Sequence, residues 1–320
     1  MPLKLSPTSS DLLRCPVCKG PLRIQPAECC CLDPACGRCY PVINDVPVLI
    51  NEGNSVFSIE DFLSQRNTFF QLKPSRAARF LDRVMPPISV NLVSRDNYRR
   101  LAELLARETD APQLLILGGS VVGQGMQPLL DAPRLQLIET DVSFGPRTAL
   151  VCDGHDIPFP DDSLDGVVAQ AVLEHVADPH AVAGEIHRVL RPGGLVYAET
   201  PFMQQMHGGR YDFERFSYWG HRRLFRAFEE VDSGVATGPG TALAWSYRYF
   251  LRSFARSRRM RHLLNLFGSL TSVWLLLFDR ILIRRPEAIA AASGYYFLGR
   301  KSNTILTDRE LVYEYKQPCA

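Results

Sequence analysis

The chain has 320 residues, of which 46% are hydrophobic and 22% charged, and its formal net charge is +2. This composition is typical of a globular protein with a sizeable core, long enough for one catalytic domain plus additions. The nearly neutral balance excludes a polycation that binds nucleic acid through bulk charge alone.

The first eighteen residues, MPLKLSPTSSDLLRCPVC, contain neither the apolar core nor the small-residue cleavage site of a secretory signal. Seven of the nine cysteines lie between Cys15 and Cys39. Closely spaced cysteines without a signal peptide bind metal more often than they form disulfides. We therefore expect a cytoplasmic protein, with membrane association left open by an apolar segment near residue 270.

Residues 11–51 form a cysteine-rich module. CPVCKG places Cys15 and Cys18 in a C-x2-C knuckle, and tetrahedral zinc needs two further thiolates. The expected second pair is Cys31 and Cys36. The other cysteines of the module remain alternatives: Cys29, Cys30 and Cys39.

The stretches CPVCKGPL and CGRCYPVINDVPVLI resemble the zinc-ribbon family that includes the small activator subunit of tRNA and protein methyltransferases. The chain departs from that family at Asn44-Asp45, where a glycine is usual, and in a C-x4-C second knuckle instead of C-x2-C. The resemblance implies a structural Zn²⁺, since four protein thiolates leave no open position for a substrate. The alternative is a metal-free cysteine cluster that only packs.

Residues 55–112 are predicted to be mainly helical, most clearly over 90–107, where leucines recur at helical spacing. Residues 113–302 then alternate short apolar runs with amphipathic segments such as His180–Leu190. The apolar runs are Leu114–Leu117, Leu135–Ile138, Leu164–Ala169, Leu195–Ala198 and Gly294–Arg300. This alternation predicts an α/β fold with a mostly parallel sheet.

One continuous stretch, Asp153–Pro201, reads DGHDIPFPDDSLDGVVAQAVLEHVADPHAVAGEIHRVLRPGGLVYAETP. It resembles the type 11 family of class I methyltransferases in its IPF, LEH and RVLRPGG motifs. The resemblance implies a Rossmann-like, mostly parallel seven-stranded sheet and S-adenosyl-L-methionine as cofactor. We expect RPGG to end the helix before it, with the fifth strand beginning near Leu195.

Ligands of open α/β sheets bind beyond the carboxyl ends of the strands. The resemblance implies that Asp153 accepts a hydrogen bond from the adenine amino group, with Gly154 beside it. It also implies that Asp141 binds the ribose hydroxyls, for which Glu139 is a weaker substitute. Gln170 ends the fourth strand and is a further cofactor residue. The alternative for Asp141 is a solvated acid at a strand end.

The glycine loop, LLILGGSVVGQGM, departs from the family pattern [DE]-x-G-x-G-x-G. We expect Gly118, Gly119 and Gly123 to let the backbone approach the cofactor. The acidic residue expected near Ile116 is absent, so a fold that has lost its cofactor is the alternative.

The segment TPFMQQMHGGRYDFERFSYWGHRRLFRAF lies where class I methyltransferases bind their acceptor. His207 is the first choice for a catalytic base, because the ordinary histidine pKa suits neutral pH, and Tyr211 is the second. Three further residues are weaker choices: Asp212, Arg215 and His221. His175, in the LEH motif, is interpreted as a wall residue. The [DN]-P-P-[YF] signature is absent, which disfavours methylation of DNA bases.

Residues 242–284 are predicted to form a helical insertion before the last strand, followed by a C-terminal tail, 303–320. Arg248, Arg252 and Arg256 recur at i, i+4 and i+8, and Leu263–Ile283 is mostly apolar. Such a helix would reach about 30 Å, near the thickness of a bilayer core. Three interpretations remain: a lid over the acceptor, a peripheral membrane contact through 248–283, or a transmembrane span.

The predicted function is S-adenosylmethionine-dependent methyl transfer, to an oxygen of a small molecule, a glycan or a lipid-linked precursor. One alternative is a catalytically inactive methyltransferase fold that binds or regulates a partner. Another is an RNA methyltransferase whose ribbon and arginines contact phosphates, but nucleic acid is the less favoured partner. The sequence predicts no particular protein partner.

Overall fold

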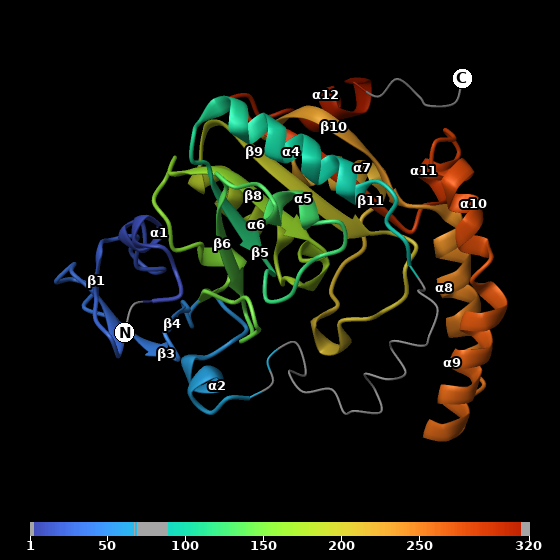
Figure 1. Ribbon diagram of the computed structural model, residues 1–320, viewed down its shortest axis with the longest axis horizontal. Coiled ribbons are helices and arrows are strands. Elements are labelled where there is room, and N and C mark those ends of the chain that lie inside the picture. The colour runs from blue at the N-terminus through green and yellow to red at the C-terminus, as the bar shows by residue number, and fades with distance from the viewer. Residues whose placement is uncertain (1–2, 67, 69–88, 315–320) are drawn as a thin grey trace.

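A computed structural model describes residues 3–66, 68 and 89–314 (Figure 1). One sheet has the strand order β1-β2-β3-β4-β7-β6-β5-β8-β9-β11-β10. Four strands come from the cysteine-rich segment: β1 Leu22–Ile24, β2 Glu28–Cys31, β3 Cys39–Ile43 and β4 Val46–Leu49. The other seven are β5 Gln113–Leu117, β6 Gln136–Asp141, β7 Leu150–Cys152, β8 Leu164–Gln170, β9 Leu190–Pro201, β10 Phe228–Thr237 and β11 Gly294–Lys301.

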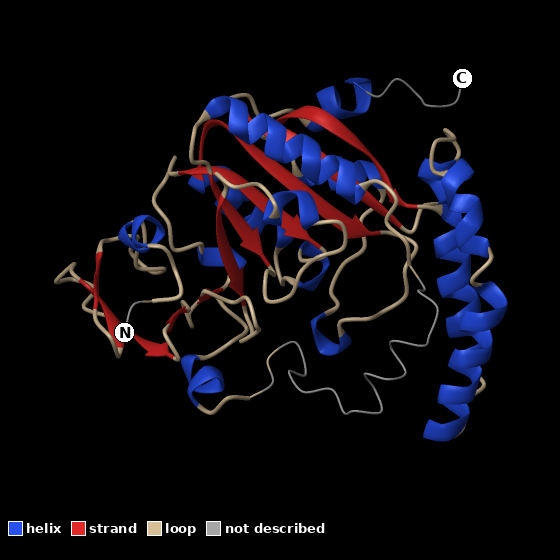
Figure 2. Ribbon diagram, viewed as in Figure 1, coloured by secondary structure: helices blue, strands red, loops and turns tan. Residues whose placement is uncertain are grey.

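These last seven strands form the Rossmann-like sheet that the sequence predicts. β5 to β9 run parallel to one another, whereas β11 is antiparallel to both β9 and β10. Figure 2 shows helices on both faces of this sheet. The fold-class prediction is therefore confirmed, and the cysteine-rich strands extend the sheet beyond it.

Two helices cover the two faces of the central strands. α4 (Ser94–Glu108) buries Tyr98 and Leu101 against β5, β8 and β9. α6 (Pro179–Val189) packs on the opposite face through Val182 and Ile186. Asp178 caps α6, because its carboxylate accepts a hydrogen bond from the Ala181 backbone N–H. The shorter helices are α1 Pro7–Asp11, α2 Ile59–Leu63, α5 Gln127–Leu130, α7 Tyr218–Leu224 and α12 Asp308–Glu314.

Two sequence predictions about these segments need qualification. The prediction of helix over 55–112 falls partly outside the described residues, and α2 and α4 are the helices described within it. The RPGG motif does not lie between α6 and its following strand, because β9 already begins at Leu190. Instead it forms a bulge in β9, where Gly193 has φ +76° and the register with β8 shifts.

The cysteine-rich segment joins the methyltransferase-like sheet directly. β4 pairs in parallel with β7, placing Val48 opposite Val151 and Leu49 opposite Cys152. The two segments also share one hydrophobic core, in which Tyr40 packs with the central strands. This arrangement makes the cysteine-rich segment part of the same folded body.

The predicted helical insertion lies between β10 and β11 and comprises α8 Pro239–Arg252, α9 Arg258–Ser272, α10 Leu275–Leu282 and α11 Ala288–Ala291. Two details differ from the prediction. The apolar stretch 263–283 is not one helix but breaks between α9 and α10. The predicted row of three arginines does not form, since α8 ends at Arg252, Arg248 is buried, and Arg256 lies beyond the helix.

Within the described residues, no single helix is both long and apolar enough to cross a bilayer. By length and composition, α9 and α10 together would be, with a bend of 45° between them.

Candidate cofactor and acceptor site

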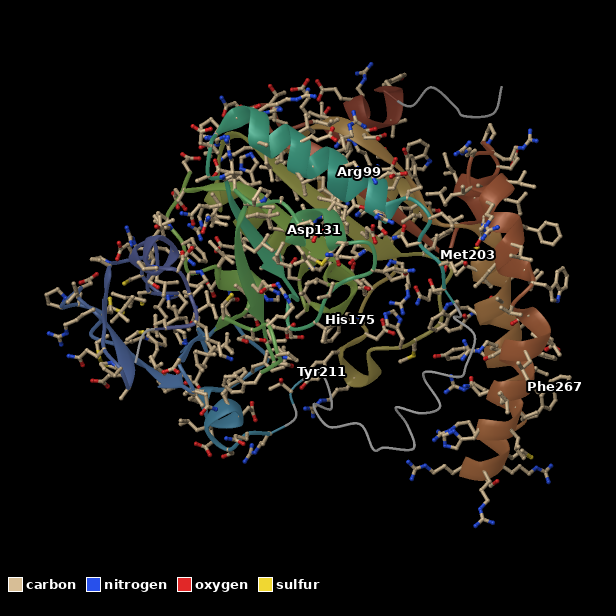
Figure 3. All side chains as sticks on the ribbon, in the orientation of Figure 1. Arg99, Asp131, His175, Met203, Tyr211 and Phe267 are labelled. Atoms are coloured by element: carbon tan, nitrogen blue, oxygen red, sulfur yellow. A yellow bond between two sulfur atoms is a disulfide. The ribbon has the colours of Figure 1, made fainter. Side chains whose placement is uncertain are left out.

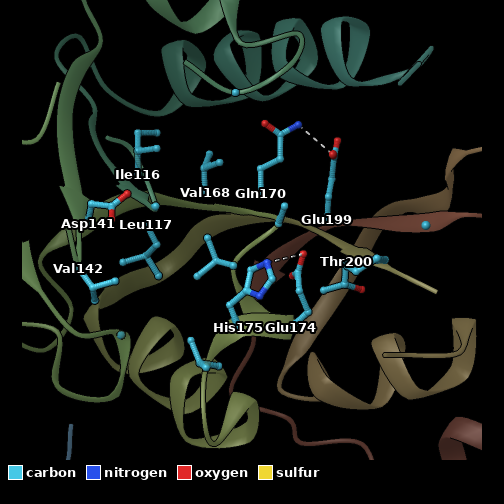
Figure 4. A pocket seen from close by; sticks show the side chains of 18 of the residues that line it. Ile116, Leu117, Asp141, Val142, Val168, Gln170, Glu174, His175, Glu199 and Thr200 are labelled. Carbon is cyan, nitrogen blue, oxygen red and sulfur yellow. Dashed lines mark hydrogen bonds and ion pairs between the residues drawn. The ribbon is translucent and has the colours of Figure 1, made fainter. Parts of the chain in front are cut away.

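A cavity of about 390 Å³ lies at the carboxyl ends of β5, β6, β8 and β9 (Figure 4). Small-molecule sites commonly occupy about 300–1,000 Å³. Asp141 and Val142 line one side of the cavity, and Glu174, His175 and Thr200 line another. The cavity therefore connects the strand ends where a cofactor is expected with the segment where an acceptor is expected.

The glycine loop approaches the cavity closely at two positions. Gly118 has φ +72°, and a Cβ there would lie 2.7 Å from a methyl carbon of Val172. A Cβ on Gly123 would lie 2.0 Å from the Gln170 side-chain oxygen. Both glycines line the cavity, but Gly119 does not: its N–H donates to the Thr140 carbonyl at 2.7 Å. Two of the three predicted glycines thus face the cavity.

Asp141 lies at the end of β6 and is 4% exposed. Its Oδ2 accepts a hydrogen bond of 3.1 Å from the Ser120 N–H, and burial raises the pKa of its carboxyl. Its side chain lines the cavity, so the solvated-acid alternative does not describe it. Glu139, the weaker substitute, pairs instead with Arg147 and does not line the cavity.

Asp153 is held from two sides. Its Oδ1 accepts hydrogen bonds from the His155 backbone N–H and contacts the His155 ring Nδ1 at 2.6 Å. Its Oδ2 accepts a 2.5 Å bond from the Ser55 hydroxyl. Burial acts to raise the pKa of Asp153, but the hydrogen bonds from His155 and Ser55 outweigh it and lower that pKa. Asp153 and Gly154 both line the cavity. The lowered pKa of Asp153 keeps its carboxylate ionised there.

Ser55 was not predicted from the sequence. It belongs to the segment that follows β4, and its neighbours Val56 and Phe57 line the cavity next to Asp153. The cysteine-rich segment therefore leads directly into the wall of the site. No local pattern signals this, because it depends on the pairing of β4 with β7.

Gln170 belongs to a polar network at the ends of β8 and β9. Its amide donates to Glu199 at 2.9 Å (Figure 4). The Asn91 amide donates to the same carboxylate at 2.8 Å. Burial raises the pKa of Glu199. Glu199 had no predicted role, although an acid at the end of a buried strand is a signal for one.

Glu174 lies between two histidines at the far side of the cavity. Its side chain is fully buried, and neither carboxylate oxygen has a hydrogen-bond partner among the described residues. Its Oε1 lies 3.7 Å from Nε2 of His175 and 3.7 Å from Nε2 of His207, which are ion-pair distances. These three residues bring metal-ligand or proton-transfer groups within 4.8 Å of one another.

Backbone carbonyls fix the orientation of both rings. Nδ1 of His175 lies 2.9 Å from the Tyr211 carbonyl, and Nδ1 of His207 lies 3.2 Å from the Gln205 carbonyl. The Tyr211 carbonyl is an acceptor, so Nδ1 of His175 carries the proton. Nδ1 of His207 lies between the Gln205 carbonyl, an acceptor, and Nη2 of Arg215, a donor at 3.4 Å. Nε2 of each ring faces Glu174. Burial lowers the pKa of His175. For His207, burial acts in the same direction, but the Glu174 carboxylate outweighs it and raises the pKa.

Glu174 had no predicted role, although it stands in the quoted LEH motif. The sequence does not show that Glu174 is buried without a hydrogen-bond partner. That burial indicates a role for Glu174, because a buried carboxylate is costly unless a cation or proton donor faces it.

The other predicted acceptor residues have mainly structural contacts. The Tyr211 ring packs on Phe57 at 5.4 Å, its hydroxyl accepts from Arg210, and it does not line the cavity. Asp212 accepts from Arg215 and from the His207 backbone N–H at 2.7 Å. Burial opposes ionisation, but the Arg215 pairing lowers the pKa of Asp212 to about 2. This pair fixes the loop that carries His207.

His221 does not line the cavity either. It is buried in α7 against Phe225, with ring centroids 5.3 Å apart, and burial lowers its pKa to about 3. Its contacts are those of a packing residue, so the structure does not support the weaker choice of His221 at the acceptor.

The four predicted zinc ligands come together. Cys15, Cys18, Cys31 and Cys36 have all their sulfurs within 4.8 Å of one another. The Cys15–Cys36 distance is 3.7 Å and the Cys18–Cys31 distance is 3.4 Å. Zinc–sulfur bonds of about 2.3 Å in a tetrahedron require sulfurs about 3.8 Å apart, so this donor set fits Zn²⁺.

The alternative ligands are placed elsewhere. Cys30 and Cys39 face each other across β2 and β3 and form a disulfide, and Cys29 is buried in the hydrophobic core. The module thus contains one disulfide beside the four-cysteine cluster, although closely spaced cysteines without a signal peptide more often bind metal. The Tyr40 hydroxyl lies 3.2 Å from the Cys15 sulfur, where it can hydrogen-bond to that ligand and orient it.

Comparison with known proteins identifies the domain in which the cavity lies. The family described as "Methyltransferase domain" matches residues 122–198, from the glycine loop to β9. A stretch of 101 residues is 39% identical to the demethylmenaquinone methyltransferase of Symbiobacterium thermophilum, covering 31% of this chain and 36% of that protein. This chain carries a class I S-adenosylmethionine-dependent methyltransferase domain. The first curated relatives are matched over only 14% to 36% of their own lengths.

A second relative is a short protein that matches along almost its whole length. A segment of 55 residues is 33% identical to a UPF0434 protein of Pseudomonas savastanoi pv. phaseolicola, covering 90% of that protein and 17% of this chain. Through this segment the chain belongs to the UPF0434 family. Among solved structures, the geranyl diphosphate C-methyltransferase of Streptomyces coelicolor aligns with a TM-score of 0.39 and 13% identity, over 63% of this chain and 75% of that chain.

Proposed function

We propose that the enzyme transfers the methyl group of S-adenosylmethionine to an oxygen of a small molecule, a glycan or a lipid-linked precursor. The observation that carries the proposal is the single cavity that joins Asp141 and Asp153 to the Glu174–His207 pair. A lipid-linked acceptor would be met at a membrane surface, and a peripheral contact through 248–283 is one of the three interpretations of the sequence.

The residues around the cavity suit the cofactor. Asp141 offers two acceptor oxygens for the ribose hydroxyls, and Asp153 with Gly154 lies where the adenine is expected. Gly118 and Gly123 allow close backbone approach. When bound, S-adenosylmethionine supplies a methyl group that leaves its sulfonium as the new bond to oxygen forms. The remaining work for the chain is alignment and removal of the acceptor proton.

His207 is the proposed base. His207 and Glu174 both line the cavity, and Nε2 of His207 lies 3.7 Å from Oε1 of Glu174. This nitrogen is proposed to accept the hydroxyl proton of an acceptor. Glu174 is fully buried and would stabilise the imidazolium that forms. Tyr211 is not proposed as a base. Its backbone carbonyl accepts a hydrogen bond from Nδ1 of His175 and so orients that ring.

The cysteine cluster is proposed to hold a structural Zn²⁺ through Cys15, Cys18, Cys31 and Cys36. Four thiolates with matching sulfur separations support this, and no position remains for a substrate. The metal would stabilise a small module whose own core is limited.

Replacing Asp141 with Ala should weaken S-adenosylmethionine binding by about 100-fold or more. The reason is the loss of two charge-assisted hydrogen bonds to ribose, each contributing about 1.5–3 kcal/mol. Isothermal titration calorimetry with S-adenosylmethionine and S-adenosylhomocysteine measures it. Asp110→Ala is the matched control, because Asp110 is exposed and pairs only with Arg134. Equal affinity in the wild type and the Asp141 variant would contradict the assigned site.

The reaction itself is tested with S-adenosylmethionine labelled in its methyl group, incubated with separate polar and lipid extracts of the source cells. Label that becomes covalently attached to an oxygen of an extracted compound supports the proposal. Label found on nitrogen or carbon, or on RNA added in parallel, would replace it. A protein that binds neither cofactor form would be the inactive, partner-binding alternative, which the missing acid near Ile116 favours.

A further inference from the structure

The helical insertion has an inverted distribution of side chains. The residues that α9 and α10 bury are mostly small or polar: Gly268, Ser269, Ser272, Leu276 and Asp279. A Cβ on Gly268 would lie 3.0 Å from Arg248 of α8, so the helices approach closely there. Asp279 accepts hydrogen bonds from the Gly240 and Thr241 backbone N–H groups at the start of α8. The inner side of α9 and α10 therefore packs closely on α8 and forms specific hydrogen bonds with it.

The opposite side of α9 and α10 carries large apolar side chains. We call it the outer apolar face, made of Leu263, Leu266, Phe267, Leu270, Trp274, Leu277, Phe278 and Ile281, each between 41% and 66% exposed. Their spacing of three and four residues places them along one stripe. In Figure 3, Phe267 points away from the rest of the molecule.

This face is at least as large as the largest apolar patch that a typical monomer exposes. Its three aromatic side chains alone carry about 150–250 Å² each, so the eight side chains, each about half exposed, together present several hundred Å². A helix that packs only to cover a core turns its leucines and phenylalanines inward, whereas α9 and α10 turn them outward. The outer apolar face is thus built to meet something apolar.

The charges around this face identify its partner. Residues 239–286 contain nine arginines and one acid, Asp279, which is fully buried, although the whole chain has a net charge of only +2. Exposed arginines gather at both ends of the pair: Arg256, Arg258, Arg259 and Arg261 at one, and Arg280, Arg284 and Arg285 at the other. None of these seven forms an ion pair with any residue that the structure describes.

We infer that α9 and α10 lie in the plane of an anionic lipid bilayer, with the outer apolar face among the acyl chains and the flanking arginines on the phosphates. Interfacial helices have this combination of an apolar face, basic flanks and tryptophan. The arginines supply the charge complementarity, and one helix separates this surface from the active site. That helix is α8, whose Trp245 lies 6.2 Å from the His207 ring. The inference adds a partner to the proposed function without depending on the reaction.

Sedimentation of the full chain with vesicles tests the inference. We expect binding to phosphatidylcholine vesicles that contain phosphatidylglycerol, weaker binding to pure phosphatidylcholine, and a decrease as salt is added. Arg258→Gln, Arg259→Gln and Arg261→Gln together should weaken the binding about 100-fold. The matched control is the same change at Arg99, Arg134 and Arg309, which are exposed on other helices or loops.

A second pair of variants tests the apolar contact. Phe267→Ser with Leu270→Ser should weaken vesicle binding at least about tenfold, without loss of folding because both side chains are exposed. Ile305→Ser with Val312→Ser, also exposed, should have no effect. Brominated lipids should quench the fluorescence of Trp274, and Trp274→Phe should remove that quenching.

Two results would overturn the inference. The first is equal pelleting with charged and neutral vesicles by all variants. The second is a concentration-dependent dimer, without vesicle binding, that Phe267→Ser with Leu270→Ser dissociates; this would assign the outer apolar face to a second copy of the chain. Neither result bears on cofactor binding, so the proposed function stands or falls separately.

Discussion

Replacing His207 with Gln is expected to lower the rate constant of methyl transfer by about 100- to 10,000-fold, the range that positioned general bases contribute. Cofactor affinity should stay unchanged, because His207 lies at the acceptor side of the cavity. The assay is the transfer of labelled methyl to the acceptor found in the extracts, with calorimetry of S-adenosylmethionine beside it. His180→Gln is the control, since His180 is exposed on α6.

The dependence on pH gives a second, independent readout. A base must be neutral to accept a proton, and Glu174 raises the pKa of His207 above its ordinary value of 6.5. The rate should therefore fall as the pH decreases through a midpoint above 6.5. Glu174→Gln removes the carboxylate and should move this midpoint to lower pH. A midpoint unchanged by Glu174→Gln would show that another group is the base.

Removing the metal from the cysteine cluster is expected to disturb both stability and cofactor binding. Structural zinc contributes about 10–16 kcal/mol to the folding of small zinc modules, so Cys18→Ser should unfold the ribbon. The chain would then lose β4 from the sheet edge and the Ser55 hydrogen bond to Asp153. A hydrogen bond to a charged group contributes about 1.5–3 kcal/mol, so S-adenosylmethionine should bind at least about tenfold more weakly.

The measurement combines metal analysis, differential scanning calorimetry and titration with S-adenosylmethionine. Cys29→Ala is the control, because Cys29 is buried in the same module but lies outside the four-cysteine cluster. One zinc per wild-type chain and none in Cys18→Ser are expected. Full cofactor affinity in a zinc-free protein would show that the ribbon does not support the site.

The sequence predicted the central fold well because the evidence for it is local. Buried strands such as Leu164–Ala169 are continuous apolar runs, and they appear in the structure within β8. The helix after Asp178 has both a cap and an apolar face, and α6 begins and ends within a residue or two of the prediction. The clustering of the four cysteines was also expected from the sequence, starting from the fixed spacing of the first knuckle.

What the sequence could not give depends on contacts between distant segments. The parallel pairing of β4 with β7 brings Ser55 to Asp153 across 98 residues. The burial of Glu174 between two histidines depends on where the loop carrying His207 folds back. Arg248 was expected on one helix face with Arg252 and Arg256, but it is buried and donates to Asn265 of α9 at 2.8 Å. Helical periodicity indicates which residues share one face of a helix, but not which element packs against that face.

The pairing of β4 with β7 also fixes the ratio of the ribbon to the catalytic domain. A ribbon on a separate subunit would dissociate from its enzyme on dilution, whereas a tethered ribbon meets the sheet edge at an effective concentration in the millimolar range whatever the protein concentration. Any separate subunit that bound at β7 would first have to displace β4. The catalytic domain and its ribbon are therefore always present in a ratio of one to one, and the level of a second gene product cannot adjust this contact.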